Sequence, residues 1–279
     1  MFALFVLGAA MLGAWVTVYC FWAWRYSPEL RSRRASASAP GKLPKAAVVL
    51  SLRGADPFLD RCLNGLLNQD YPDYVVRIVV DNELDPAWDM VHHFVAASGC
   101  HNVRIESLKA RRPTCGLRIS SLLQAVSSLD PGIGAVVLVD ADVVPHATWL
   151  RELAGPMRDP AVGATTGIRW YMPESANLGT LVRYLWNAAA IPQMYAFGIG
   201  WGGSLAIRTE LLADARLTDK WSRILFEDTF TANEVRKLGH KLEFVPAATM
   251  VNKEVTDLKS ALGSPTAPNS SSERYLFLS

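Results

Sequence analysis

The sequence predicts an α/β fold, a mostly parallel open sheet flanked by helices, preceded by an N-terminal transmembrane helix. Two observations lead to this prediction. Residues 46–139 alternate between short apolar runs and segments whose apolar residues recur at helical spacing, the pattern of strand–helix–strand units. Residues 2–24 contain no charged residue, and a basic stretch follows them directly.

The composition excludes several classes of protein. The chain has 279 residues, 50% of them hydrophobic and 19% charged, so it is neither disordered throughout nor collagen-like. A formal net charge of +2 gives no reason to expect a nucleic-acid partner. The 4 cysteines are too few and too scattered for a disulfide framework or a C-x-x-C metal pair.

The uncharged N-terminal run predicts a single-pass membrane anchor over residues 1–25. Its 23 residues make a helix about 34 Å long, enough to cross a hydrocarbon core of about 30 Å. A cleaved signal peptide and a buried core helix are the alternatives. The basic residues after the run orient the rest of the chain toward the cytoplasm. Residues 26–44, basic and rich in Ser, Ala and Pro, are expected to form a tether.

From residue 45 the predicted elements follow one another closely. Apolar runs predict buried strands at residues 46–52, 75–80 and 135–139, and a further short strand is predicted at residues 103–107. Helical spacing predicts helices at residues 58–67, 88–97 and 117–126. Ligands of open α/β sheets bind beyond the carboxyl ends of the strands. The segments 51–56, 81–85 and 140–142 are therefore the first places to look for a site.

Asp140 and Asp142 follow the most apolar of these strands. Two aspartates at i and i+2 point to the same side, and Mg²⁺ or Mn²⁺ prefers such carboxylate oxygens beside substrate phosphates. A turn or a helix cap is the alternative for so short a pattern. No G-x-G-x-x-G or P-loop motif follows a predicted strand, and the glycine-rich segment 198–203 does not join a strand to a helix. The sequence also contains no G-x-S-x-G or H-x-x-x-H motif, so the simplest dinucleotide, hydrolase and zinc predictions are removed.

Glu227 and Asp228 open a further predicted helix, which Gly239 ends. Asp228 is expected to cap this helix or, if it faces Asp140 and Asp142 across a cleft, to act as a general base toward a hydroxyl group. The apolar aromatic segment 181–197 predicts either a lipid-facing surface or a core helix and loop.

Taken together, residues 45–246 resemble the inverting family 2 glycosyltransferases of the GT-A fold, a Rossmann-like nucleotide-diphospho-sugar transferase fold, and within them the ceramide glucosyltransferase-like branch. The resemblance rests on the order and spacing of short motifs at residues 52–57, 69–74, 81–86, 140–142, 201–204 and 227–228. It implies a glycosyltransferase domain over residues 45–255. It also implies transfer of a hexose, with inversion, from a donor such as UDP-glucose to a lipid or saccharide hydroxyl.

The resemblance also implies roles for individual residues. Arg53, Asp81 or Glu83, and Asp140 would bind the nucleotide sugar, and Asp142 would ligate a divalent metal, Mn²⁺ or Mg²⁺. Asp228 would be the catalytic base. The acceptor side of the site would be formed by a last set of residues: Trp201, Gly202, Gly203 and Glu227.

One departure from the family pattern is clear. Members of the family carry a Q-x-x-R-W motif near the donor diphosphate, and this sequence has none. Residues 256–279, rich in Ser, Pro and Gly, instead predict a disordered tail. Two alternatives to an active enzyme follow: a truncated or non-catalytic descendant that binds nucleotide sugar, and a membrane-tethered scaffold whose acidic residues are only caps and turns. The sequence does not indicate an oligomeric state.

Overall fold

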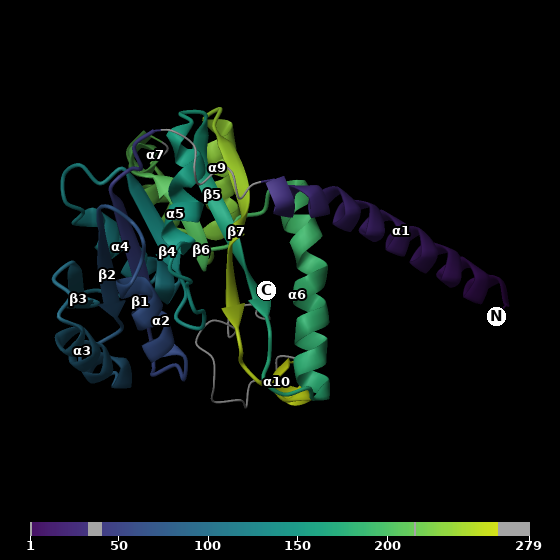
Figure 1. Ribbon diagram of the computed structural model, residues 1–279, viewed down its shortest axis with the longest axis horizontal. Coiled ribbons are helices and arrows are strands. Elements are labelled where there is room, and N and C mark those ends of the chain that lie inside the picture. Colours follow the sequence, from purple (N-terminus) through teal and green to yellow (C-terminus); the bar gives the residue numbers. More distant parts are fainter. Residues whose placement is uncertain (1, 33–40, 215, 262–279) are drawn as a thin grey trace.

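The computed structural model describes residues 2–32, 41–214 and 216–261 (Figure 1). Its centre is a seven-stranded mixed sheet in the order β3-β2-β1-β4-β6-β5-β7. Strands β1, β2, β3 and β4 pair with one another in parallel, whereas β6 runs antiparallel to both β4 and β5. The last pair, β5 and β7, is again parallel.

The strands are β1 (Ala46–Leu52), β2 (Tyr74–Val80), β3 (Val103–Ser107), β4 (Ala135–Val139), β5 (Val162–Tyr171), β6 (Ser204–Arg208) and β7 (Lys241–Asn252). The helices are α1 (Phe2–Ser32), α2 (Leu59–Leu67), α3 (Pro86–Ser98), α4 (Leu117–Ser127), α5 (Trp149–Ala154), α6 (Leu178–Phe197), α7 (Thr209–Asp214), α8 (Leu217–Trp221), α9 (Asp228–Lys237) and α10 (Leu258–Ala261), with a 3₁₀ turn at Gly155–Arg158.

The strands predicted at residues 46–52, 103–107 and 135–139 are confirmed with the same bounds, and β2 begins one residue earlier than predicted. Helices α2, α3 and α4 are confirmed within two residues at each end. The sheet is mostly parallel, as predicted, but it is mixed because β6 enters it in reverse, between β4 and β5. The sequence analysis assigned no strand after residue 139, so it contained no element that could reverse the direction.

Two hydrophobic cores lie on the two faces of the sheet. Successive strand side chains point to opposite faces, so Val48 and Leu50 of β1 pack with helices α2 and α5, while Val49 packs on the other face with α4 and α8. Burying both faces requires the continuous apolar runs seen in β1 and β4. This arrangement leaves the carboxyl edge of the strands for polar loops.

The N-terminal segment forms helix α1, which extends away from the sheet and meets the rest of the molecule at its C-terminal end, near α6 (Figure 1). Among the described residues, no helix is long and apolar enough to cross a membrane. The side chains of residues 2–5, 7 and 9, within the predicted anchor, lie outside the description.

The boundaries predicted for the tether and the tail differ from those of the structure. Helix α1 continues to Ser32, so the predicted tether at 26–44 begins inside a helix, and residues 33–40 lie outside the description. At the other end, Thr256 is buried and α10 follows it, so the folded part passes the predicted limit at residue 255. The reason is packing against α6, where the Thr180 hydroxyl donates to the Thr256 carbonyl over 3.1 Å. Residues 262–279 of the predicted tail are outside the description.

Candidate active site

The carboxyl ends of β1, β2 and β4 meet at one edge of the sheet. Leu52 lies opposite Val80, and Leu50 lies opposite Val139, so the loops that follow these strands start side by side. Arg53, Asp81 and Asp140 are the first residues after the three strands. The register therefore brings together three segments that are far apart in sequence, as the strand pattern predicts.

The guanidinium of Arg118, in the first turn of α4, joins the two acidic motifs. Its Nη1 donates to Asp140, its Nε donates to Oε1 of Glu227 over 2.8 Å, and its Nη2 donates to the Gly202 carbonyl over 2.8 Å. Burial acts to lower the pKa of Arg118, but Asp140 and Glu227 outweigh it and raise this pKa above its ordinary value. Arg118 is thus a permanent cation held by three partners.

Asp142 is 4% exposed and is paired with a second arginine, Arg169 of β5, which donates to its Oδ2 through Nη1. The Asn252 side chain donates to the Asp142 carbonyl over 2.6 Å and so ties the Asp140–Asp142 turn to the end of β7. Burial raises the pKa of Asp142 above the usual aspartate value, Arg169 opposes this rise, and the neighbouring carboxylates of Asp140 and Asp56 add to it. Three carboxylates therefore interact at this turn.

Aromatic rings stack against the same arginine. The Arg169 guanidinium lies 5.0 Å from the ring centroid of Tyr171 and 5.4 Å from that of Trp201. Arg183 of α6 lies 4.5 Å from the Tyr171 ring and donates to Glu254 over 2.8 Å. A line of alternating cations and rings thus connects Asp142 to helix α6.

Asp228 is the first residue of α9, and Glu227 occupies the N-cap position without a capping side-chain bond. The Asp228 carboxylate accepts a hydrogen bond from the Thr229 N–H over 2.6 Å and another from the Gly202 backbone. Burial, and then the charge of Glu227, raise the pKa of Asp228 above that of an ordinary aspartate. A carboxylate with a raised pKa is a better proton acceptor, which suits a general base.

The turn at residues 201–203 passes so close to these side chains that two positions require glycine. A Cβ atom on Gly202 would lie 2.6 Å from Oε1 of Glu227. One on Gly203 would lie 2.5 Å from Oδ2 of Asp140 and 2.1 Å from the Trp201 ring. The segment predicted to line the acceptor side therefore contacts both acidic motifs.

The residues predicted to bind nucleotide fall into two groups. Arg53 is exposed and lies 3.7 Å from Asp81, so these two face each other at the sheet edge. Glu83 instead accepts from the Ser107 hydroxyl over 3.2 Å and points toward β3. Asp85 caps α3 through the Ala87 N–H and accepts from the Gly54 N–H, which fixes the loop that carries Arg53.

The acidic side chains fit a divalent cation shared with a diphosphate. Within residues 2–32, 41–214 and 216–261, no three His, Cys, Asp or Glu side chains gather as a metal-binding group. A cation of this kind needs one or two carboxylates, because substrate phosphates and water supply its other ligands. Asp140 and Asp142 provide two hard oxygen donors on one turn, beside a third acid, Asp56. Asp142 and Asp140 are the residues that would hold the cation.

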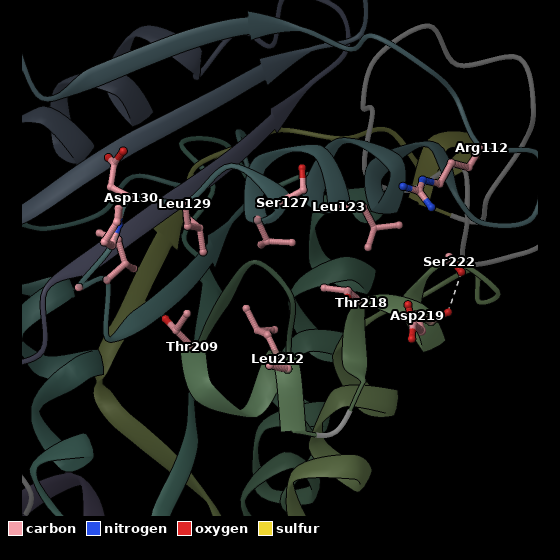
Figure 2. Close-up of a pocket in the computed structure, with 15 residues that line it drawn as sticks. Arg112, Leu123, Ser127, Leu129, Asp130, Thr209, Leu212, Thr218, Asp219 and Ser222 are labelled. Carbon is pink, nitrogen blue, oxygen red and sulfur yellow. Dashed lines mark hydrogen bonds between the residues drawn. The ribbon is translucent and has the colours of Figure 1, made fainter.

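A cavity of about 600 Å³ lies elsewhere, at the amino end of β4. Figure 2 shows Leu123, Leu129 and Leu212 on its walls and Asp130, Thr209 and Asp219 around them. None of the predicted site residues lines this cavity. It is separated from the Asp140–Asp142 turn by the length of β4.

The sequence analysis missed Arg118 and Arg169. Arg118 follows a basic loop at the start of a predicted helix, so its place near the sheet edge could have been found, but not its partners. Arg169 lies in β5, a strand that was not predicted. Their partners are 22 and 27 residues away in sequence, and no local pattern encodes such pairs.

The open sheet, the acidic pair after β4 and the acid at the start of α9 form the arrangement that the resemblance to nucleotide-sugar transferases of the GT-A type predicts. The chain belongs to glycosyltransferase family 21, whose model, described as "Glycosyl transferase family 21", matches residues 4–263. The ceramide glucosyltransferase-like resemblance expected from the sequence is confirmed.

Solved structures show the same fold. The mannosyltransferase PcManGT from Pyrobaculum calidifontis, in complex with GDP-Man and Mn²⁺, is 21% identical with a TM-score of 0.60, over 88% of this chain and 66% of its own. GalNAc-T7 with UDP, GalNAc and Mn²⁺ is 15% identical with a TM-score of 0.56, over 77% of this chain and 44% of its own. TarS from S. aureus is 14% identical, with a TM-score of 0.52, over 75% and 37%. The chain thus spans two thirds or less of each of these proteins.

Proposed function

We propose that the protein transfers a hexose, with inversion, from a nucleotide-diphosphate donor such as UDP-glucose to an acceptor hydroxyl. The observation that carries the proposal is the Arg118 bridge, which joins the Asp140 carboxylate to Glu227, the neighbour of Asp228. One side of the bridge is suited to a cation and a diphosphate, and the other side presents a base. The Mn²⁺ in the structures of PcManGT and GalNAc-T7 supports a divalent-metal requirement.

In this mechanism each side chain has a separate task. Arg53 and Asp81 position the nucleoside part of the donor. Asp140 and Asp142 would hold a divalent cation, which would supply positive charge to the leaving diphosphate. Asp228 takes the proton of the acceptor hydroxyl as that oxygen attacks the anomeric carbon, and the bond to the diphosphate breaks in the same displacement. Trp201, Gly202 and Gly203 border the acceptor and keep it aligned with Asp228. The anomeric configuration inverts because one displacement takes place.

The acceptor in this proposal is a lipid hydroxyl, with a saccharide as the alternative. Helix α6 packs on β5 and β7 through Ile191 and Met194, and a stripe on its other side remains exposed. That stripe consists of Leu178, Leu181 and Leu185, with Trp186 beside it at 74% exposure. An exposed apolar stripe next to the site is suited to a membrane surface.

Membrane attachment through the N-terminal helix, with the transferase domain on the cytoplasmic side, belongs to the same proposal. Its support is the uncharged run at residues 2–24 and the exposure of large apolar side chains on α1, including Met11, Trp15 and Trp24. Trp22 of α1 lies 6.3 Å from Phe197 of α6, ring to ring, so the two apolar helices adjoin. Both would then contact one membrane.

One competing function is that of a family member that binds nucleotide sugar without transfer. A transfer assay separates the two. Full-length protein in Mn²⁺ is given UDP-glucose with ceramide vesicles or with soluble saccharides, and UDP release and the anomeric proton of the product are followed by NMR. Acceptor-dependent UDP release with an inverted product supports the enzyme. Donor binding without turnover on either acceptor class supports the competing function.

A further inference from the structure

The two aspartates of the Asp140–Asp142 turn are paired with different arginines that are held in different ways. Arg118 has three acceptors on three segments: the carboxylates of Asp140 and Glu227 and the Gly202 carbonyl. Arg169 donates to Asp142 and stacks on aromatic rings. Breaking the Arg118 pairs would leave two buried carboxylates uncompensated, whereas a cation on Asp142 can replace the charge that Arg169 supplies there.

We propose that Arg169 is an exchanging arginine, which neutralises Asp142 in the absence of metal and pairs with the donor diphosphate once the cation occupies Asp142. This inference rests on the proposed function, because it needs a diphosphate at the Asp140–Asp142 turn. Arg169 is then a positioning residue for the donor and a competitor of the metal for the same carboxylate.

Burial is the reason that Asp142 needs a counter-charge. Its side chain is 4% exposed, and an unpaired carboxylate in such a place costs several kcal/mol. Arg169, with a side chain 15% exposed, supplies that charge in the metal-free protein. A divalent cation on Asp142 supplies it instead and repels the guanidinium, so the two cations exclude each other from this carboxylate.

The released guanidinium has a suitable new partner beside it. Arg169 is planar and carries paired N–H donors that match phosphate oxygens, and Tyr171 and Trp201 keep its plane at the edge of the site. Arg169 provides a positive side chain beside the Asp140–Asp142 turn, where the proposed diphosphate would lie.

The exchange makes two predictions of opposite sign for Arg169→Gln. Mn²⁺ alone, titrated into nucleotide-free full-length protein and followed by the electron paramagnetic resonance of free Mn²⁺, is expected to bind about tenfold more tightly, because its competitor is gone. UDP in saturating Mn²⁺ is expected to bind about tenfold more weakly by calorimetry, because a charge-assisted contact is lost. A purely structural role for Arg169 would weaken both.

Arg169→Lys and Arg104→Gln complete the experiment. Lysine keeps the positive charge but not the paired N–H donors of the guanidinium, so Mn²⁺ affinity should match that of the unaltered protein while UDP affinity falls. If Arg169→Gln gives no cooperative melt, Arg169→Lys tests the exchange in its place. Arg104→Gln removes an exposed arginine paired with Glu106 on β3 and should change neither affinity. Unchanged or weaker Mn²⁺ binding by folded Arg169→Gln, or wild-type UDP binding by Arg169→Lys, overturns the exchange alone. Failure of the unaltered protein to bind Mn²⁺ and UDP overturns the proposed function as well.

Discussion

At the scale of single residues, Arg118 decides how the acidic side chains lie. Its side chain is 27% exposed and those of Asp140 and Glu227 are 12% and 5% exposed, so the three charges share a poorly solvated place. Pairs of this kind add little net stability over apolar residues, but removing one partner is costly. The guanidinium therefore acts mainly by fixing the two acidic motifs relative to each other.

Replacing this arginine tests that role. Arg118→Met is expected to lower stability by about 3–5 kcal/mol, because two buried carboxylates lose their cation. Arg118→Lys should recover part of that stability but not the donor affinity, since an ammonium group cannot reach three partners in the same geometry. Thermal melts and UDP calorimetry measure the two effects. The exposed control Arg104→Gln is expected to lie within about 0.5 kcal/mol of the unaltered protein. Unchanged stability and UDP affinity in Arg118→Met would show that Arg118 does not fix the two acidic motifs.

The raised pKa of Asp228 gives a prediction about pH. Transfer requires the deprotonated base, so kcat/KM should fall on the acid side around a pKa higher than that of ordinary aspartate. Burial is the first cause of this raised pKa and the charge of Glu227 is the next. Glu227→Gln removes that charge and should move the acid limb to lower pH. If the acid limb of the kcat/KM profile stays at the same pH or moves to higher pH, Asp228 is not the group that takes the proton.

The same raised pKa predicts how Asp228 affects stability. The folded protein holds the Asp228 proton more tightly than the unfolded chain, so ionisation destabilises the fold as pH rises through the unfolded pKa toward the folded one. Asp228→Asn should therefore melt no lower than the unaltered protein at pH 7, with a difference that shrinks in acid, while transfer is lost and UDP binding is kept. A lower melting temperature of Asp228→Asn than of the unaltered protein at pH 7 would contradict the predicted direction of this stability effect.

At the scale of elements, the turn between α6 and β6 holds the site together. Gly203→Ala is expected to cost about 1–3 kcal/mol, because the added methyl group collides with the Asp140 carboxylate and the Trp201 ring. It should also weaken Mn²⁺-dependent UDP binding by displacing Asp140. Gly13→Ala, inside helix α1 and with no atom within 4 Å of the added Cβ, is the control; it should not lower stability and should leave UDP binding unchanged. If the two variants have the same stability and the same UDP affinity, the turn at residues 201–203 does not hold the site together.

The elements also show which parts of the structure a sequence can predict. Strands β1 and β4 are short runs bounded by polar residues or glycine, so their bounds could be predicted. Strand β5 contains buried threonines and an arginine, and β7 contains a proline, so neither has a continuous apolar pattern. The acidic motifs were found because they follow strands and a helix start. Their arginine partners depend on tertiary packing across the sheet, which local spacing does not encode.

At the scale of the whole molecule, α1 and α6 place an apolar surface on the side of the sheet beyond β7 (Figure 1). The double variant Leu185→Glu/Trp186→Glu is expected to reduce binding of full-length protein to phosphatidylcholine vesicles several-fold, because both side chains are exposed apolar groups. UDP binding should not change. Leu238→Glu, at an exposed position after α9, is the control for adding charge. Equal vesicle binding by both variants would argue against α6 as the membrane-facing side.

The edge formed by β1, β2 and β4 is expected to bind a nucleotide-sugar donor through Asp140 and Asp142. Calorimetric titration of UDP-glucose into full-length protein, in Mn²⁺ and again in EDTA, tests it most directly. The account predicts binding that requires Mn²⁺ and that Asp142→Asn weakens about tenfold or more, through loss of a charged metal ligand. Folded protein that binds no UDP-glucose, or binds it equally well in EDTA and with Asp142→Asn, would contradict the claim.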